Sequence, residues 1–294
     1  LNNNLRYEGR ALYAMFGLVT GAVINILGDW LLIRVLSMGV FGAGLSTAVS
    51  QVISFTLLLI FHRRMAQGRI GVSHISRRLK TYLTIMRVGF PALIRQGLTS
   101  ISNGLLNNLT KPYGDAAIAA MSVVGRYSML VMCVGLGIGQ GFQPVSAFNY
   151  GAKRYSRVKK ASYVTMLLGL ISIGTLSVVC FALAPEIISL FNSEKSPLIE
   201  EIGAQALRFN CMVLWVLPFT VVGNMMFQSI GKRVPAILLS ALQNGVAFIP
   251  MIYLLPYLFG KYNGNGLVGL ELAQPAAHVI TAAITLPCTE IFLS

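Results

Sequence analysis

Long apolar runs dominate the pattern of this chain, and its polar residues gather in the short stretches between them. Eight runs reach the ~20 mostly apolar residues that a membrane-spanning helix needs. The predicted spans are residues 11–36, 39–62, 83–108, 116–143, 158–184, 203–230, 235–259 and 266–291. The runs show no period-two alternation, and backbone groups in lipid must be satisfied within the segment. We therefore predict an all-α transmembrane bundle of eight spanning helices.

Residues 69–82 ("RIGVSHISRRLKTY") follow a different pattern, because they are basic and amphipathic. Such a segment is expected to lie on the membrane surface as a connector rather than to cross the membrane. The sequence thus predicts three parts: a remnant of a first lobe with two spans in residues 1–68, an interfacial connector in residues 69–82, and a second lobe with six spans in residues 83–294.

The composition agrees with a membrane protein and excludes several other classes. The chain is 55% hydrophobic and 11% charged, with a mean hydropathy of +0.70, whereas soluble domains carry about 25% charged residues. Its net charge of +14 does not indicate a nucleic-acid partner, because the basic residues lie between the apolar runs. The four cysteines have neither disulfide nor metal spacing.

The basic residues also predict the orientation of the chain. Sixteen of the 23 Lys and Arg residues lie before the first run or in the connections after the second, fourth and sixth runs, and four lie on the opposite side. An excess of Lys and Arg marks cytoplasmic connections. The chain is therefore predicted to enter its first span from the cytoplasm.

Two of the predicted spans begin alike. The stretches "GVFGAGLSTAVSQVIS" (39–54) and "GLVGLELAQPAAHVIT" (266–281) align without gaps and share Gly39 with Gly266 and Gly42 with Gly269. Both copies run in the same direction across the membrane, so we interpret them as a parallel repeat of the kind found in several transporter folds. If the two halves were once equal, about four further helices are expected before Leu1.

One carboxylate interrupts the first span. A charge at mid-membrane costs at least ~2.5–3.5 kcal/mol, so such residues tend to face a cavity, find partners and serve function. Asn25 lies one turn before Asp29 on the same helical face, and Thr47 follows the turn near Ser37 at about the distance by which Asp29 precedes it. These oxygen donors predict a cation-coupling site for Na⁺, or a carboxyl group that carries a proton. The alternative is that Asp29 only packs between helices or reaches the outer interface.

Uncharged polar and methionine side chains recur in the later spans. A wide cavity with polar and soft apolar walls would suit bulky, varied ligands. The predicted substrate-cavity residues are Gln96, Asn103, Asn107, Met129, Asn224 and Met225. The alternative for each of them is ordinary polar packing between helices. For His278 the sequence favours a packing or pore-lining role, and it leaves the role of Glu271 open.

Several stretches resemble the multidrug and toxic compound extrusion (MATE) family. The resemblance is carried by "GAVINILGDWLLI" (21–33), by "GVFGAGLSTAVSQ" (39–51) and above all by "GIGQGFQPVSAFNYGAKRYSRVKKA" (137–161). It implies a twelve-helix antiporter of two six-helix lobes, here without the first four helices. In this family an Asn and an Asp of the fifth helix and a Thr of the sixth belong to a first-lobe cation site, and they match Asn25, Asp29 and Thr47.

The residues and the resemblance together predict a multi-pass efflux antiporter of the cell membrane. It would export cationic amphipathic drugs or toxic cations in exchange for Na⁺ or H⁺, need no other cofactor, bind no nucleic acid and act as a monomer when full length. The alternative is a flippase for lipid-linked oligosaccharides, which would favour a cationic central cavity, whereas deep cations are few here. We expect no enzyme, because paired catalytic groups such as HExxH are missing.

Overall fold

The structure, a computed structural model, consists of helices and their connections. It describes residues 1–66, 68, 71, 76, 78–191 and 196–293, and this part of the chain is 91% helical without a β-strand. The predicted all-α class is therefore confirmed. The chain divides into two compact units, unit 1 (Leu1–Leu79) and unit 2 (Lys80–Ser294), and each is described by itself.

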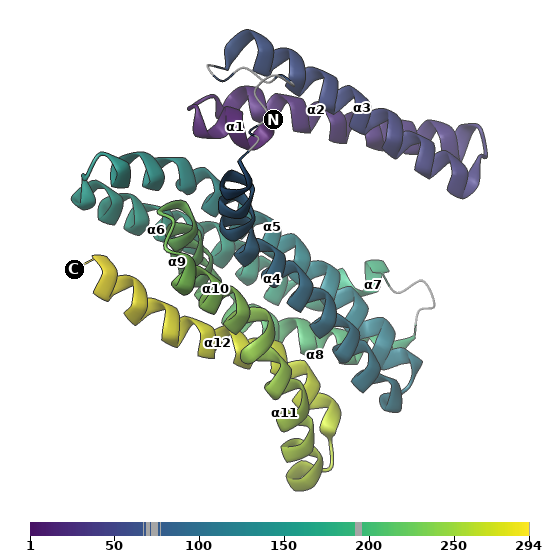
Figure 1. Cartoon of the computed structure of the whole chain (residues 1–294). Helices are drawn as coiled ribbons and strands as arrows, with labels where there is room; N and C mark the ends of the chain where they lie inside the picture. The colour runs from purple at the N-terminus through teal and green to yellow at the C-terminus, as the bar shows by residue number, and fades with distance from the viewer. Residues whose placement is uncertain (67, 69–70, 72–75, 77, 192–195, 294) are drawn as a thin grey trace. The chain divides into compact units, whose positions relative to one another are not determined.

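Unit 1 is a helical hairpin with a short helix at its base (Figure 1). Its elements are α1 (Asn2–Tyr7), α2 (Ala11–Asp29), the π-helix η1 (Trp30–Val35) and α3 (Gly39–Met65). Leu5, Ala14 and Leu58 form a small core where α1 meets the hairpin. Most of the remaining apolar side chains of α2 and α3 are exposed, as in a protein whose surface lies in lipid or against other protein.

Small residues hold α2 and α3 close together. A Cβ atom added at Gly21 would lie 2.6 Å from the Cβ of Ser54, and one added at Gly28 would lie 2.5 Å from Ser46 Oγ. Ser54 Oγ also donates a hydrogen bond of 2.8 Å to the carbonyl of Gly17. Because lipid gives no hydrophobic drive for helix association, such close backbone approach supplies the packing energy. It also fixes the register of the two helices.

Unit 2 is a larger bundle. Its elements are α4 (Leu79–Thr110, from Lys80 on), η3 (Lys111–Tyr113), α5 (Asp115–Gly151), α6 (Tyr155–Ala182), α7 (Ala184–Phe191), α8 (Pro197–Val213), η4 (Leu214–Val216), α9 (Leu217–Ser229), α10 (Arg233–Ala241), the π-helix η5 (Leu242–Val246), α11 (Phe248–Asn263) and α12 (Gly266–Leu293). Helix α5 packs against α6, α8 and α9, and α12 packs against α8, α9 and α11. The main apolar core includes Val131, Leu207 and Leu217.

Seven helical stretches among the described residues are long and apolar enough to cross a membrane. They correspond to every predicted span except residues 83–108. That segment lies in α4, a helix of 32 residues that is long enough but less apolar than the others. The predicted 203–230 span is also not one continuous α-helix, because the 3₁₀ turn η4 separates α8 from α9 just before Pro218.

The predicted division into three parts is not tested by the structure and stays a prediction. Much of the connector at residues 69–82 lies outside the described residues. Its last residues, from Leu79 on, form the start of α4.

The two glycines matched by the internal repeat occupy equivalent places within their own units. A Cβ atom at Gly42 would lie 3.1 Å from the carbonyl oxygen of Leu32, and one at Gly269 would lie 2.5 Å from the carbonyl oxygen of Leu255. Each glycine thus lets the start of a helix press against the backbone of the helix before it. This shared role supports the predicted repeat.

We predict that Gly21→Ala destabilises unit 1, because the added methyl group has no room beside Ser54. Overpacking of this kind costs about 1–3 kcal/mol. Thermal unfolding of the protein in detergent measures the effect. The matched control is Gly44→Ala, where an added Cβ meets nothing within 4 Å. Equal melting temperatures for the two variants would contradict the packing described here.

Candidate functional site

The side chain of Asn25 ties α2 to α3. Its Nδ2 donates to Ser46 Oγ at 3.3 Å and to Thr47 Oγ1 at 3.4 Å, and Ser46 Oγ donates to the Asn25 carbonyl at 2.9 Å. The structure therefore brings together Asn25 and Thr47, two of the three predicted site residues. Sequence reasoning missed Ser46, a buried residue whose one signal was its place beside Thr47.

The hydrogen bonds also determine which way the Asn25 amide faces. Both hydroxyl groups already donate to backbone carbonyls, Ser46 to Asn25 and Thr47 to Ala43, the latter at 2.9 Å. A hydroxyl that has used its hydrogen can only accept from the amide. The NH₂ group of Asn25 must therefore face the hydroxyls, so its Oδ1 is left without a hydrogen bond among the described residues.

Asp29 is the last residue of α2 and lies one turn beyond Asn25. Its side chain is half-buried, and its Oδ1 is buried without a hydrogen-bond partner in the described part of the chain. The structure does not join the carboxylate to Asn25 or Thr47 by a hydrogen bond. The close contacts of Gly28 with Ser46 and of Gly21 with Ser54 fix the register, which puts Thr47 at a height between Asn25 and Asp29.

The α-helix changes to a π-helix immediately after Asp29. Element η1 begins at Trp30, and the backbone N–H of Leu36 donates to the carbonyl of Leu31 at 3.0 Å, five residues back. Short π-helical segments inside α-helices occur frequently at functional sites. Here the wider turn starts at the one acidic residue of the first span.

The donor set of this site is a single carboxylate with one amide oxygen and one hydroxyl oxygen. Within the described residues, no three His, Cys, Asp or Glu side chains gather as a metal cluster. Oxygen donors of this kind suit hard cations. The buried, unpartnered Asp29 Oδ1 fits a bound cation or a bound proton, since either would remove an uncompensated charge.

The six predicted substrate-cavity residues divide into two groups. Gln96, Asn103, Asn107 and Met129 are exposed on unit 2, the first three on α4 and Met129 on α5. Asn224 and Met225 are instead buried within the unit.

Both buried candidates have partners inside unit 2. Asn224 Nδ2 donates to Ser240 Oγ at 2.9 Å, and its Oδ1 accepts from Gln228 Nε2 at 2.6 Å. The sulfur of Met225 accepts from Gln143 Nε2 at 3.0 Å. These contacts agree with the alternative of ordinary polar packing. No observation tests whether any of the six residues contacts a substrate.

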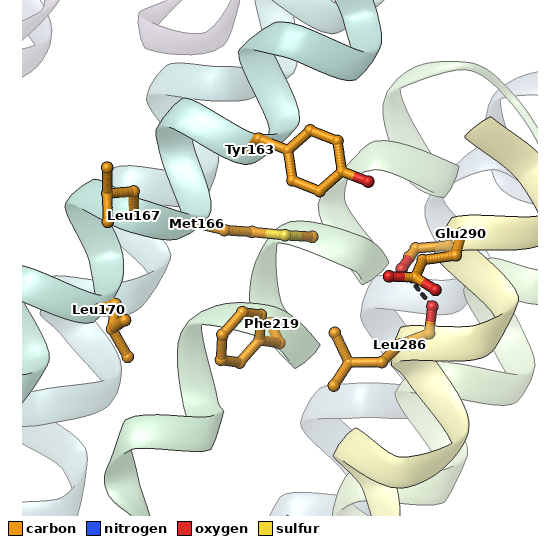
Figure 2. Close-up of a pocket in the computed structure, with 8 residues that line it drawn as sticks. Tyr163, Met166, Leu167, Leu170, Phe219, Leu286 and Glu290 are labelled. Atoms are coloured by element: carbon orange, nitrogen blue, oxygen red, sulfur yellow. Dashed lines mark hydrogen bonds between the residues drawn. The ribbon is translucent and has the colours of Figure 1, made fainter. Parts of the chain in front are cut away.

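A separate pocket of about 230 Å³ lies in unit 2 between α6, α9 and α12 (Figure 2). Its walls are mostly apolar, with Met166 from α6, Phe219 from α9 and Leu286 from α12. Tyr163 and Glu290 supply polar groups on either side of it. None of the six predicted cavity residues lines this pocket.

The chain is similar to known transporters in sequence. The model of the family described as MatE matches residues 73–254. The multidrug export protein MepA of Staphylococcus saprophyticus is 25% identical over 256 residues, which cover 87% of this chain and 56% of the relative. MepA of Staphylococcus haemolyticus is also 25% identical over 260 residues, with the same coverage. The chain thus spans about half the length of the curated relatives it matches.

Solved structures are similar to the chain as well. An outward-facing multidrug resistance MATE family transporter of the MOP superfamily superposes with a TM-score of 0.88 at 24% identity, over 98% of this chain and 64% of that one. The structure of a MATE protein in complex with MaL6 gives a TM-score of 0.87 at 25% identity, with the same coverage. The first of these superpositions, at 24% identity, shows a shared fold and nothing more.

We predict that Ser46→Ala loosens the α2–α3 hairpin. The change removes the hydrogen bond to the Asn25 carbonyl and one acceptor of the Asn25 amide, which should lower the free energy of unfolding by about 1–2 kcal/mol. Thermal unfolding of the protein in detergent measures this loss of stability. Thr56→Ala is the control, because that exposed hydroxyl donates only to Val52 of its own helix. An equal shift in both variants would show that the hydrogen bonds between the helices add nothing.

Proposed function

Because the chain belongs to the MatE family, a family of membrane transporters and not of enzymes, we propose that it serves as a multidrug efflux antiporter. The protein is a multi-span membrane protein. In the proposed reaction it exports cationic amphipathic compounds from the cell in exchange for Na⁺ or H⁺. It does so in the cell membrane and as a monomer.

The observation that carries the coupling proposal is the buried, unpartnered Oδ1 of Asp29. An ionised carboxylate in such a place is unstable unless a cation or a proton neutralises it. In this proposal Na⁺ binds the Asp29 carboxylate together with Asn25 Oδ1 and Thr47 Oγ1. With a proton instead, the Asp29 carboxyl group alone carries the charge, and Asn25 and Thr47 position it.

Coupling needs a difference in ion affinity between two conformations of the transporter. An ion shifts a conformational equilibrium only as far as it binds one state more tightly than the other. The hairpin of α2 and α3 offers such a difference, because the Asn25 amide is held by hydroxyls on the other helix. A shift of α3 along α2 would change the distance between Asp29 and Thr47, and with it the affinity for the ion.

The names of the relatives favour drug export over the alternative function, a flippase for lipid-linked oligosaccharides. The two relatives described above are multidrug export proteins. A flippase for lipid-linked sugars would need several cations in a central cavity to hold a pyrophosphate. Five or more residues from the ends of the predicted spans, the only Lys or Arg residues in the sequence are Arg95, Arg126 and Arg208.

The main test is Asp29→Asn in the full-length protein, reconstituted in liposomes. The amide keeps the shape of the side chain but neither carries the charge nor takes up the proton, so ion-driven drug export should fall by about tenfold or more. Export is measured under separately imposed Na⁺ and H⁺ gradients, which also identifies the ion. Asp115→Asn, the same chemical change at the exposed start of α5, should export normally. Wild-type export by Asp29→Asn under both gradients would refute the proposal.

The role of Thr47 as an ion ligand is tested by two substitutions. Thr47→Val removes the hydroxyl and should weaken ion binding roughly tenfold, whereas Thr47→Ser keeps the oxygen and should bind nearly as well. Trp30, which is adjacent to Asp29 and 59% exposed, reports binding by fluorescence once Trp215, the one other tryptophan, is changed to Phe. Equal affinities for the Val and Ser variants would exclude Thr47 as a ligand.

A further inference from the structure

Unit 2 contains a buried acid that the proposed Asp29 site does not use. Glu271 lies one turn inside α12, and its side chain is 2% exposed. Its Oε2 is buried without a hydrogen-bond partner, and within the described residues the carboxyl group forms no ion pair or hydrogen bond. Burial of a carboxyl group without partners costs several kcal/mol if it is charged, so a fold does not retain one for stability.

Positions next to Glu271 along α12 are apolar. Two of these neighbours, Leu270 and Ala273, are fully or almost fully buried in a cluster with Phe248 and Ile252 of α11. Among the described residues no three His, Cys, Asp or Glu side chains gather as a metal cluster, whereas a bound metal cation needs several ligands. A proton needs only the carboxyl group itself. The chemistry of the site therefore favours a proton over Na⁺.

Among the described residues, no charged group on the helices packed against α12 forms an ion pair with Glu271. The titratable groups on these elements are Glu200, Glu201, Arg208 and Cys211 of α8 and Tyr253, Tyr257, Lys261 and Tyr262 of α11; α9, η4 and η5 carry none. The guanidinium of Arg208 lies 5.8 Å from the ring of Phe181, and Lys261 Nζ lies 6.0 Å from the ring of Tyr262. Cys211 packs against the hydroxyl of Tyr127.

The polar face of α12 continues from Glu271 toward its C-terminal end. His278 lies two turns further on the same face, about 10 Å along the axis. Its Nδ1 is buried and has no hydrogen-bond partner in the described part of the chain. The face then continues with Thr281 and Thr285, both buried, whose hydroxyls donate to the backbone of their own helix at 2.7 Å.

The π-helix η5 packs against α12 and adds two unpartnered amides. Gln243 Nε2 and Asn244 Nδ2 are buried without hydrogen-bond partners among the described residues. The contact of Gly269 with Leu255 sets the antiparallel register of α11 and α12, which puts η5 near the height of His278. Four polar side chains in this part of unit 2 thus have buried atoms that no described residue satisfies.

We propose that Glu271 binds and releases a proton within unit 2 and that His278 is the next proton-binding group along α12. This inference rests on the proposed antiport, to which it adds a proton-carrying group in unit 2. The carboxylate takes up a proton and becomes a neutral carboxylic acid, and it returns to the carboxylate when that proton leaves. The amides of η5 lie near the height of His278, at the end of this route away from Glu271.

The first experiment asks whether Glu271 carries a proton in the purified protein. An infrared pH titration in lipid nanodiscs follows the C=O stretching band of protonated carboxylic acids. One band should disappear in Glu271→Gln and persist in Glu186→Gln, the same change at an exposed acid of α7. His278→Gln should shift the pH at which that band titrates. A Glu271→Gln spectrum identical to wild type at every pH would overturn the proposal.

Thermal stability separates this role from a structural one. A carboxyl group that is buried without partners adds nothing to folding, so Glu271→Gln and Glu271→Leu should melt at or above the wild-type temperature. A drop of both variants well below wild type would mean that the acid is a structural group, and it would overturn the proposal.

The transport assay distinguishes this inference from the Asp29 proposal. In the full-length protein under an imposed pH gradient, Glu271→Gln should lose about tenfold or more of its drug export, and Glu186→Gln should not. Normal export by Glu271→Gln would show that Glu271 has no part in proton coupling, whether or not Asp29 has one. Normal export by Asp29→Asn together with a defect in Glu271→Gln would leave the present inference standing and refute the first site.

Discussion

Hydrocarbon offers no hydrogen bonds, and this constraint decides how the polar side chains in the spans of this protein are arranged. Hydroxyl groups find a hydrogen-bond partner within their own helix. Those of Thr47, Thr165 and Thr281 each donate to the backbone carbonyl one turn back. Carboxyl groups have no such local solution, because an ionised carboxylate only accepts hydrogen bonds. Asp29 and Glu271 each have a buried oxygen without a hydrogen-bond partner among the described residues, so the part of the chain that the structure describes does not neutralise either of them.

Close packing of small residues positions the first of these acids. Gly28 brings the backbone of α2 against Ser46, and Ser46 in turn receives the amide of Asn25. The same contacts thus hold the hairpin together and turn the NH₂ group of Asn25 toward the hydroxyls of α3. Since the hydroxyls that hold this amide lie on one helix and Asp29 lies on the other, a movement of one helix past the other changes the site. Stability and the proposed ion binding would therefore depend on the same few contacts.

The helical hairpin and the pairing of Asn25 with Thr47 could be predicted from sequence, because helices of equal rise that leave a common turn reach equal depth. Span lengths followed from the apolar runs, although the more polar α4 does not reach the hydropathy of the other seven. The burial of Asn224 and Met225 could not be predicted. Helix α9 is buried on nearly all sides, so its sequence shows no apolar stripe that would tell an inward face from an outward one.

The π-helical turns and the partner Ser46 also escaped prediction, since a wider turn has no residue signature and serine is common in membrane helices. In each unit a span with a π-helix, η1 or η5, is followed by a helix whose matched glycine presses against its backbone. In unit 1 the acid lies on the π-containing span and its neutral partners lie on the next helix. In unit 2 the neutral amides lie in the π-helix and the acid lies on the next helix. The two units thus share the helix packing but differ in which of the two helices carries the acid. Helix packing alone does not account for an unpartnered acid in each unit, whereas the proposed ion binding accounts for both.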